Sequence, residues 1–265
     1  MIQPLRIQVS LQSPLRAFDD WSPDLAALLE RAWFDRHGAI GSATLVTEGG
    51  LPLTHAPIPL AWSVAAIGVD DPSMVLGTDW GQAIARADLP SDWFWRASAP
   101  IYRYGRIVEQ PIRKAYRPQH TWDLLRNPGK HNSQAGDYKS FDLRSPGRWV
   151  SGAITWFAWG NRDGVTDLLS RVETIGGNRK QGQGFVDRHG WSVDVVDHAP
   201  DLWDGDRLMR PYPVRLMGDR PTAIVRNWCW RPPGYLRQYA ETCAMPALVK
   251  LDTSPDPTKI AWGVC

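Results

Sequence analysis

The stretch IGGNRKQGQGFV, from Ile175 to Val186, has four glycines and two basic residues in twelve positions. Glycine lets a phosphate approach backbone N–H groups closely, and Arg179 and Lys180 add positive charge. Asn178 and Gln181 add hydrogen-bonding capacity. The stretch therefore has the residue types of a phosphate-binding loop, with its glycines at Gly176, Gly177, Gly182 and Gly184.

The position of this glycine loop decides which phosphate ligand it suits. A P-loop or a dinucleotide-binding fingerprint follows a strand and opens a helix. This loop follows a predicted helix and opens a predicted strand, and it lacks both the GK[ST] ending and the GxGxxG spacing. A long RNA or DNA backbone is therefore a better partner than a mononucleotide. A solvent-exposed, hairpin-like loop without a ligand is the alternative reading.

A second basic stretch runs from Glu109 to Arg148 without a clear apolar period. A connection of that length in a compact domain is usually functional or mobile. Basic residues bind phosphates and aromatic residues stack on unpaired bases, so this stretch is a second candidate for RNA contact. A solvated loop with its aromatic residues in the core is an equal alternative. The basic residues that we expect to contact RNA here are Lys130, Lys139 and Arg144.

The segment GKHNSQAGDYKSF places His131, Tyr138 and Lys139 close together in the chain. Such a set could act as general base and acid on a ribose 2′-hydroxyl and cleave RNA without a metal. A polar loop that contacts phosphate is the more common use of such residues. The remaining histidines have no metal-ligand spacing and the acidic residues are scattered, so we expect no metal and no cofactor.

The composition is that of a globular chain of 265 residues, with 43% hydrophobic and 22% charged residues and a net charge of +2. Three cysteines late in the chain match no zinc or disulfide pattern, which favours a reducing cytoplasm. The first residues lack a signal-peptide pattern, and no apolar run reaches the length of a membrane span.

Periodicity predicts the elements that must position these residues. Leu5–Ser13 alternates as a strand that Pro14 ends, and a helix follows with Ser22 as its N-cap and Leu25, Leu28, Leu29, Ala32 and Trp33 on one face. Residues 94–107 read as a strand or hairpin, and residues 149–160 read as a central strand. A helix follows, capped by Asn161 or Asp163 with Val165, Leu168, Leu169 and Val172 on one face, and a strand at 190–197 comes after the glycine loop.

This order predicts an α+β, ferredoxin-like (RRM-like) β-α-β-β-α-β domain. The domain would span residues 1–199, with a basic insertion at about 109–148. Residues 200–265 would form a β-rich C-terminal extension packed on it.

The chain resembles the RAMP superfamily of CRISPR-associated proteins, in which a basic glycine-rich loop follows the second helix. The opening LRIQVSLQSPL, followed by DLAALLERAW, is similar to a RAMP start. RPYPVRL and RPPGY resemble elements of the small RAMP subunit of type IV CRISPR complexes, the counterpart of the Cas five family. The resemblance covers about Leu5 to Tyr235.

The resemblance implies a non-catalytic subunit that caps one end of an effector complex. Such subunits hold the 5′ handle of the CRISPR RNA (crRNA), pack against the first backbone subunit and often carry a protruding hairpin, or thumb. In several complexes this end lies near the target DNA duplex where the protospacer-adjacent motif (PAM) is read. A metal-independent crRNA-processing endoribonuclease of the same superfamily, acting through His131, Tyr138 and Lys139, is the alternative that the resemblance leaves open.

Overall fold

The computed structural model describes residues 1–17, 21, 23–36, 58–64, 93–102, 105–114, 141–176, 184–220, 222, 224–230, 240–247, 249–251 and 260–262. Strands dominate these residues, and α1 and α4 are their two α-helices. The elements in chain order are β1 (Gln3–Ala17), α1 (Leu25–Arg36), β2 (Trp62–Val64), β3 (Trp93–Trp95), β4 (Ile101–Tyr102), β5 (Gly105–Lys114), β6 (Phe141–Gly160), α4 (Arg162–Leu169), β7 (Thr174–Ile175), β8 (Gly184–Val195), β9 (Trp203–Asp204), β10 (Arg207–Leu208), β11 (Tyr212–Pro213), a 3-10 turn (Val214–Leu216), β12 (Val225–Cys229), β13 (Ala240–Ala244), β14 (Val249–Leu251) and β15 (Ile260–Trp262).

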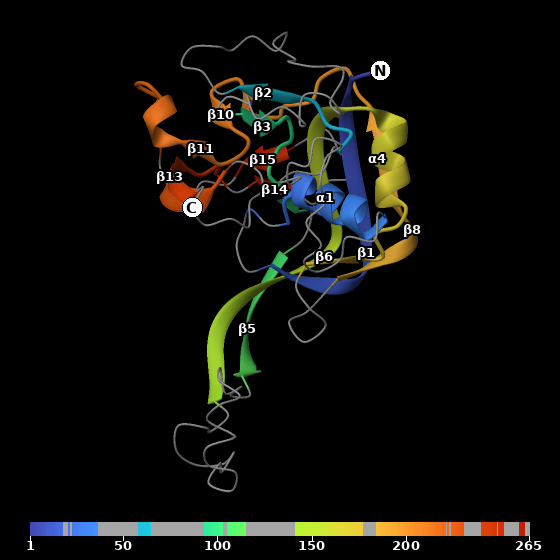
Figure 1. Ribbon diagram of the computed structural model, residues 1–265. Coiled ribbons are helices and arrows are strands. Elements are labelled where there is room, and N and C mark those ends of the chain that lie inside the picture. The colour runs from blue at the N-terminus through green and yellow to red at the C-terminus, as the bar shows by residue number, and fades with distance from the viewer. Residues whose placement is uncertain are drawn as a thin grey trace, which may run out of the picture.

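The largest sheet in the described chain has eight strands in the order β15-β14-β4-β6-β1-β8-β7, with β5 also paired to β6. β1 lies between β6 and β8 and runs antiparallel to both. β14 joins the sheet by a parallel pairing of Lys250 with Tyr102. Smaller sheets pair β2 with β3, β9 with β10, and β11 and β12 with β13. β5 and β6 project from the body as a long hairpin (Figure 1).

One face of this sheet carries the main hydrophobic core. Leu5, Ile7 and Val9 alternate along β1 and are 0% exposed, which confirms the half-buried strand predicted from the period of two. α1 and α4 contact each other and contribute buried side chains to the same cluster. Each helix hides one apolar stripe on the sheet, and that burial stabilises both elements.

The ends of the two helices show how local chemistry sets their bounds. In α1, the Ala27 backbone N–H donates to Asp24 Oδ1 at 3.0 Å, so Asp24 caps this helix and the predicted cap at Ser22 is wrong. In α4, the Gly164 N–H donates to Asn161 Oδ1 at 2.8 Å, which confirms Asn161 as a cap. Val165, Leu168 and Leu169 form the buried face of α4, as their spacing predicts.

The predicted ferredoxin-like β-α-β-β-α-β domain is wrong. The described chain is mostly strand, and its main sheet is a curled antiparallel sheet of eight strands rather than the four strands of that fold. Four further strands, β2 to β5, lie between α1 and β6, and β14 and β15 add to the same sheet from the end of the chain. Short strands carry too little alternating pattern to be read from sequence, so the prediction missed them.

Two smaller differences concern the lengths of the strands. Pro14 does not end β1, because the strand passes through an irregularity between Leu11 and Leu15 and continues to Ala17. The polar stretch at 109–148 is not one long loop. Residues 109–114 belong to β5 and residues 141–148 to β6, since cross-strand pairing extends well beyond the apolar part of β6.

A second hydrophobic cluster lies around β11, β12 and β13 and includes Trp21, Phe94 and Trp230. The buried side chain of Arg210 joins it to the main core, donating to the carbonyl oxygens of Trp95 and Ala97 and to that of Trp230. Burial lowers the pKa of Arg210, and the charges of Asp24 and Asp201 oppose that shift. These bonds give two nitrogens of the buried Arg210 guanidinium backbone partners on both clusters.

Candidate nucleic-acid interface

Most of the residues predicted to bind RNA lie outside the described part of the chain. Gly176 and Gly184 are described at the two ends of the glycine loop. Arg144 is described by its backbone, which pairs with Pro111 in the β5–β6 hairpin. Outside the described residues lie Gly177, Asn178, Arg179, Lys180, Gln181, Gly182, Lys130 and Lys139, together with the alternative catalytic residues His131 and Tyr138.

The described ends of the glycine loop pack against one side chain, that of Leu15 in β1. Gly176 has a φ of +88°, and a Cβ added there would lie 2.4 Å from Leu15 Cδ1. A Cβ added at Gly184 would lie 3.0 Å from Leu15 Cβ. These two glycines therefore let the β7–β8 hairpin close onto β1, and a positive φ with such a close approach requires glycine at position 176.

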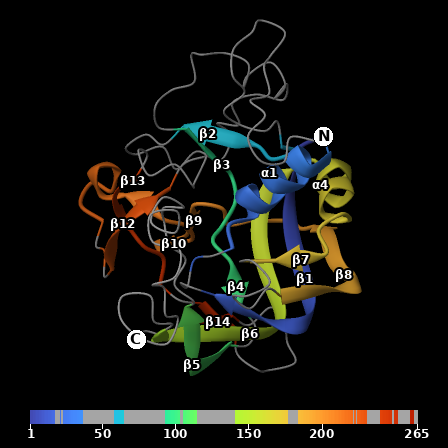
Figure 2. The same cartoon turned by 60° about the horizontal axis from the view of Figure 1, so that its bottom comes forward.

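Leu15 also connects the glycine loop to the base of the β5–β6 hairpin. Leu15 pairs with Val150 in β6, and Val150 pairs with Gly105, the first residue of β5. Two strand spacings, about 10 Å, therefore separate Leu15 from the start of the hairpin. From that base the hairpin runs through ten paired positions to Lys114 and Phe141. Figure 2 shows β5, β6 and the ends of β1 and β8 at the same end of the sheet.

The pairing of β1 with β6 and its pairing with β8 both shift in register at this end of the strand. On the β6 side the pairing passes from Leu11 with Gly152 to Leu15 with Val150. On the β8 side it passes from Val9 with Trp191 to Leu11 with Val186, so residues 187–190 lie opposite the single residue Ser10. Bulges of this kind bend a strand and re-aim its side chains, and they are frequent beside functional sites.

The β8 bulge presents polar and charged groups to solvent. Asp187, Arg188 and His189 are exposed. A Cβ on Gly190 would lie 2.7 Å from the Ser10 carbonyl oxygen and 3.0 Å from the Asp187 nitrogen, so the bulge closes only with glycine at 190. Arg188 and Phe185 were not predicted from the sequence to lie at the interface. A glycine inside a strand pattern, as in DRHGW, is the signal that could have indicated them.

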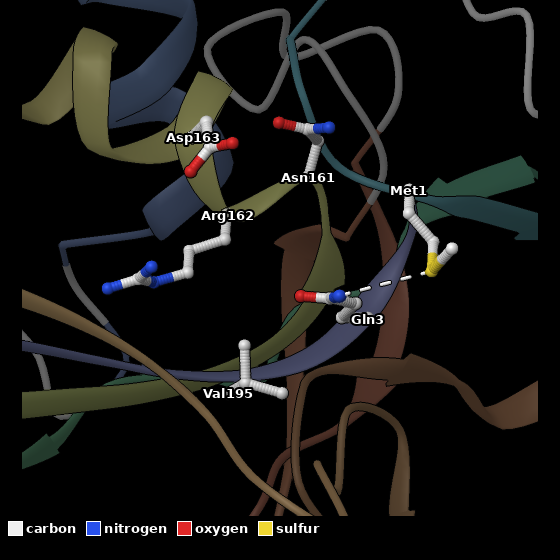
Figure 3. A pocket seen from close by; sticks show the side chains of 6 residues that line it. All are labelled: Met1, Gln3, Asn161, Arg162, Asp163 and Val195. Atoms are coloured by element: carbon white, nitrogen blue, oxygen red, sulfur yellow. Dashed lines mark hydrogen bonds between the residues drawn. The ribbon is translucent and has the colours of Figure 1, made fainter.

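The opposite end of β1 carries a pocket of about 330 Å³ lined by Met1, Gln3, Asn161, Arg162, Asp163 and Val195. Figure 3 shows these side chains around the start of α4. Arg162 Nε donates to the Val193 carbonyl oxygen at 3.1 Å, and Asn161 caps the helix. Both polar groups therefore have structural roles in the fold, and the pocket contributes no residue to the interface at the glycine loop.

Glu30 is the buried acid of the described chain whose pKa departs strongly from its ordinary value. Its side chain lies in α1 with the residue 5% exposed. Burial first, and then the charge of Asp24, raise its pKa from 4.5 to about 8, and the neighbouring Trp95 side chain opposes the shift. Glu30 is thus a neutral acid inside the core and not part of the interface.

Among the described residues, no group of three or more His, Cys, Asp or Glu side chains could hold a metal ion. No helix in the described ranges is long and apolar enough to cross a membrane. Comparisons with protein-family models and with curated proteins find no match to this chain.

Proposed function

We propose that this protein is a non-catalytic crRNA-binding subunit of a type IV CRISPR ribonucleoprotein effector complex, and that it holds the 5′ handle of the crRNA. The observation that carries the proposal is the meeting of the glycine loop and the base of the long β5–β6 hairpin at Leu15. The similarity of IGGNRKQGQGFV to the RAMP loop supports the choice of RNA.

This arrangement suits a nucleic-acid strand better than a small ligand. The loop sequence supplies Arg179 and Lys180, and the hairpin strand β6 carries Arg144. Arg144 lies six positions along β6 from Val150, about 20 Å from the hairpin base, so basic groups from the two hairpins can contact well-separated phosphates of one long chain, which a mononucleotide does not offer. The glycines at 176, 177, 182 and 184 would let that backbone approach the loop closely.

The partners that go with this proposal are a backbone subunit of the complex and, near the PAM, target DNA. The β5–β6 hairpin has the shape of the thumb that such subunits carry. We also propose a cytoplasmic location, because three cysteines without a disulfide pattern favour a reducing compartment. The endoribonuclease alternative depends on His131, Tyr138 and Lys139, which lie outside the described residues.

The RNA that accompanies the protein tests this proposal directly. The full chain would be purified from cells that carry a CRISPR array and its neighbouring genes, and the bound RNA would be sequenced and its ends mapped. We expect RNAs of uniform length that share one repeat-derived 5′ end, together with other subunits. RNA without a common end, or no enriched RNA, would contradict the proposal. Precursor that stays uncut when the gene is deleted would indicate the nuclease instead.

A double substitution tests the role of the loop. Arg179→Ala with Lys180→Ala should weaken binding of handle RNA and reduce the salt slope of log K by about 1.4, at about 0.7 per phosphate contact on a single strand. Arg31→Ala with Arg36→Ala removes the same charge from α1 and is the matched control. Fluorescence anisotropy over a series of salt concentrations measures both. An unchanged slope in the loop variant would exclude the loop from RNA binding.

A further inference from the structure

Phe185 differs from the other aromatic residues whose burial is described. Its side chain is 45% exposed, whereas the others are buried or half-buried. Val186, the next residue, pairs with the core-facing Leu11. Because side chains alternate along a strand, Phe185 points to the face of the sheet opposite to α1 and α4. Phe185 is thus an exposed ring among described aromatic residues that are otherwise at least half-buried, and its flat face is open to stack on an unpaired base.

The backbone holds Phe185 in place from three sides. Its N–H donates to Ser13 Oγ at 2.8 Å. Thr174 of β7 pairs with it across the hairpin, and Gly184 before it packs against Leu15. A ring fixed on such a frame loses little conformational entropy when a flat ligand stacks on it, and this favours binding.

The charges around Phe185 are those of a phosphate-binding surface. Arg188 and His189 lie three and four residues further on, on the exposed β8 bulge, next to the one exposed acid of that bulge, Asp187. Arg179 and Lys180 lie on the other side in sequence. On the same open face of the sheet, the acid Asp194 is paired with Arg6 at 3.1 Å. The residue types from 177 to 189 thus combine one exposed ring with a net positive charge.

We propose that Phe185, Arg188 and His189 form a stacking subsite for single-stranded RNA, in which the Phe185 ring stacks on one unpaired base and Arg188 and His189 contact the adjoining phosphate. The subsite tolerates any base, because every base has a π-face. This inference rests on the proposed function, because the same RNA strand would also occupy the glycine loop. The excess of basic groups next to the ring favours an RNA strand over an apolar protein surface.

Full-length protein and an oligouridylate of about eight nucleotides test this subsite, with an abasic strand of the same length as the second probe. Phe185→Ala should weaken oligouridylate binding about five- to a hundredfold and leave the abasic strand unaffected. Phe185→Trp should restore binding because it keeps a stacking surface. Arg188→Ala with His189→Ala should weaken both probes. Val195→Ala, an exposed apolar residue on the same strand, is the matched control.

The outcomes separate this inference from the proposed function. If Phe185→Ala binds oligouridylate like the unaltered protein while the Arg179 and Lys180 variant loses affinity, the stacking subsite is wrong and loop binding stands. If Phe185→Ala loses affinity and the Arg179 and Lys180 variant does not, the stacking subsite is supported and RNA binding by the glycine loop is contradicted. An equal loss on both probes would overturn base stacking. A loss of copurifying subunits with unchanged RNA affinity would show that Phe185 contacts protein instead.

Discussion

The two halves of β1 have different surroundings. From Gln3 to Val9 the strand pairs without interruption with residues 154–160 of β6, and its alternate side chains are fully buried. From Ser10 onward the register shifts on both sides, and glycines at 176, 184 and 190 pack closely against the strand. The first half contributes to the core. The second half is irregularly paired, and the described ends of the glycine loop, the β8 bulge and the base of the β5–β6 hairpin lie beside it at one end of the sheet.

Irregular strand pairing in β1 is confined to its second half. A bulge leaves a residue unpaired and disrupts the ladder of hydrogen bonds. It is therefore stable only where other contacts around it offset that loss. Here those contacts are side chain to backbone, such as Leu15 against Gly176 and Ser13 Oγ against the Phe185 nitrogen. Stability and RNA binding should therefore separate along the length of β1, and three substitutions sharpen or break that separation.

The largest effect should come from the regular half. Ile7→Ala removes a side chain that is 0% exposed, so the lost burial and the cavity left behind should lower the free energy of unfolding by about 2–5 kcal/mol. Val195→Ala, at an exposed site, should stay within about 0.5 kcal/mol. Urea titration measures both. RNA affinity of folded Ile7→Ala should equal that of the unaltered protein, and a specific loss of affinity would break the proposed division of β1.

The next effect concerns Glu30 in the helix-covered core. Its folded pKa of about 8 lies above its ordinary value of 4.5, so the folded chain binds this proton more tightly than the unfolded chain. Stability from this group is present below pH 4.5 and is lost as the pH rises towards 8. Glu30→Gln cannot ionise and should gain about 3 kcal/mol over the unaltered protein at pH 7.

Unfolding midpoints measured from pH 4 to pH 9 check the Glu30 prediction, with about 1.4 kcal/mol expected per pH unit inside the window. Asp35→Asn is the matched control, since Asp35 lies on the same helix and its side chain is exposed. The same pH slope in the Glu30→Gln variant and in the unaltered protein would contradict the assignment. Glu30→Gln should not change the pH dependence of RNA affinity, because Glu30 lies in the core and not at the interface.

The smallest effect should come from the interrupted half. A Cβ on Gly190 would meet the Ser10 carbonyl oxygen at 2.7 Å and the Asp187 nitrogen at 3.0 Å, so the bulge must shift. Gly190→Ala should cost about 1–3 kcal/mol. Gly205→Ala, at a positive φ with no atom within 4 Å of the added Cβ, should cost about 1 kcal/mol. Thermal unfolding compares the two, and equal losses would show that close packing at the bulge does not matter.

Sequence reasoning recovered the elements that a local pattern encodes. The period of two in LRIQVSL predicted β1, and the apolar spacing of Val165, Leu168 and Leu169 after a cap at Asn161 or Asp163 predicted α4. The glycine loop was recognised by its residue types, although its described glycines have a packing role against Leu15 that the sequence does not indicate. Phe185 was missed because nothing in FVDRHGWSV tells which apolar residue of a strand stays exposed.

By itself, the sequence determined the strand and helix periods, a helix capped at Asn161 or Asp163, and the basic, glycine-rich character of residues 175–186. Only the tertiary structure decided that β14 reaches β4, and that Leu15 lies between the two described ends of the glycine loop and the base of the β5–β6 hairpin. The reason is physical. Periodicity and capping are satisfied among neighbours in the chain, whereas sheet order and bulges depend on which distant strand supplies the missing hydrogen bonds and fills the space.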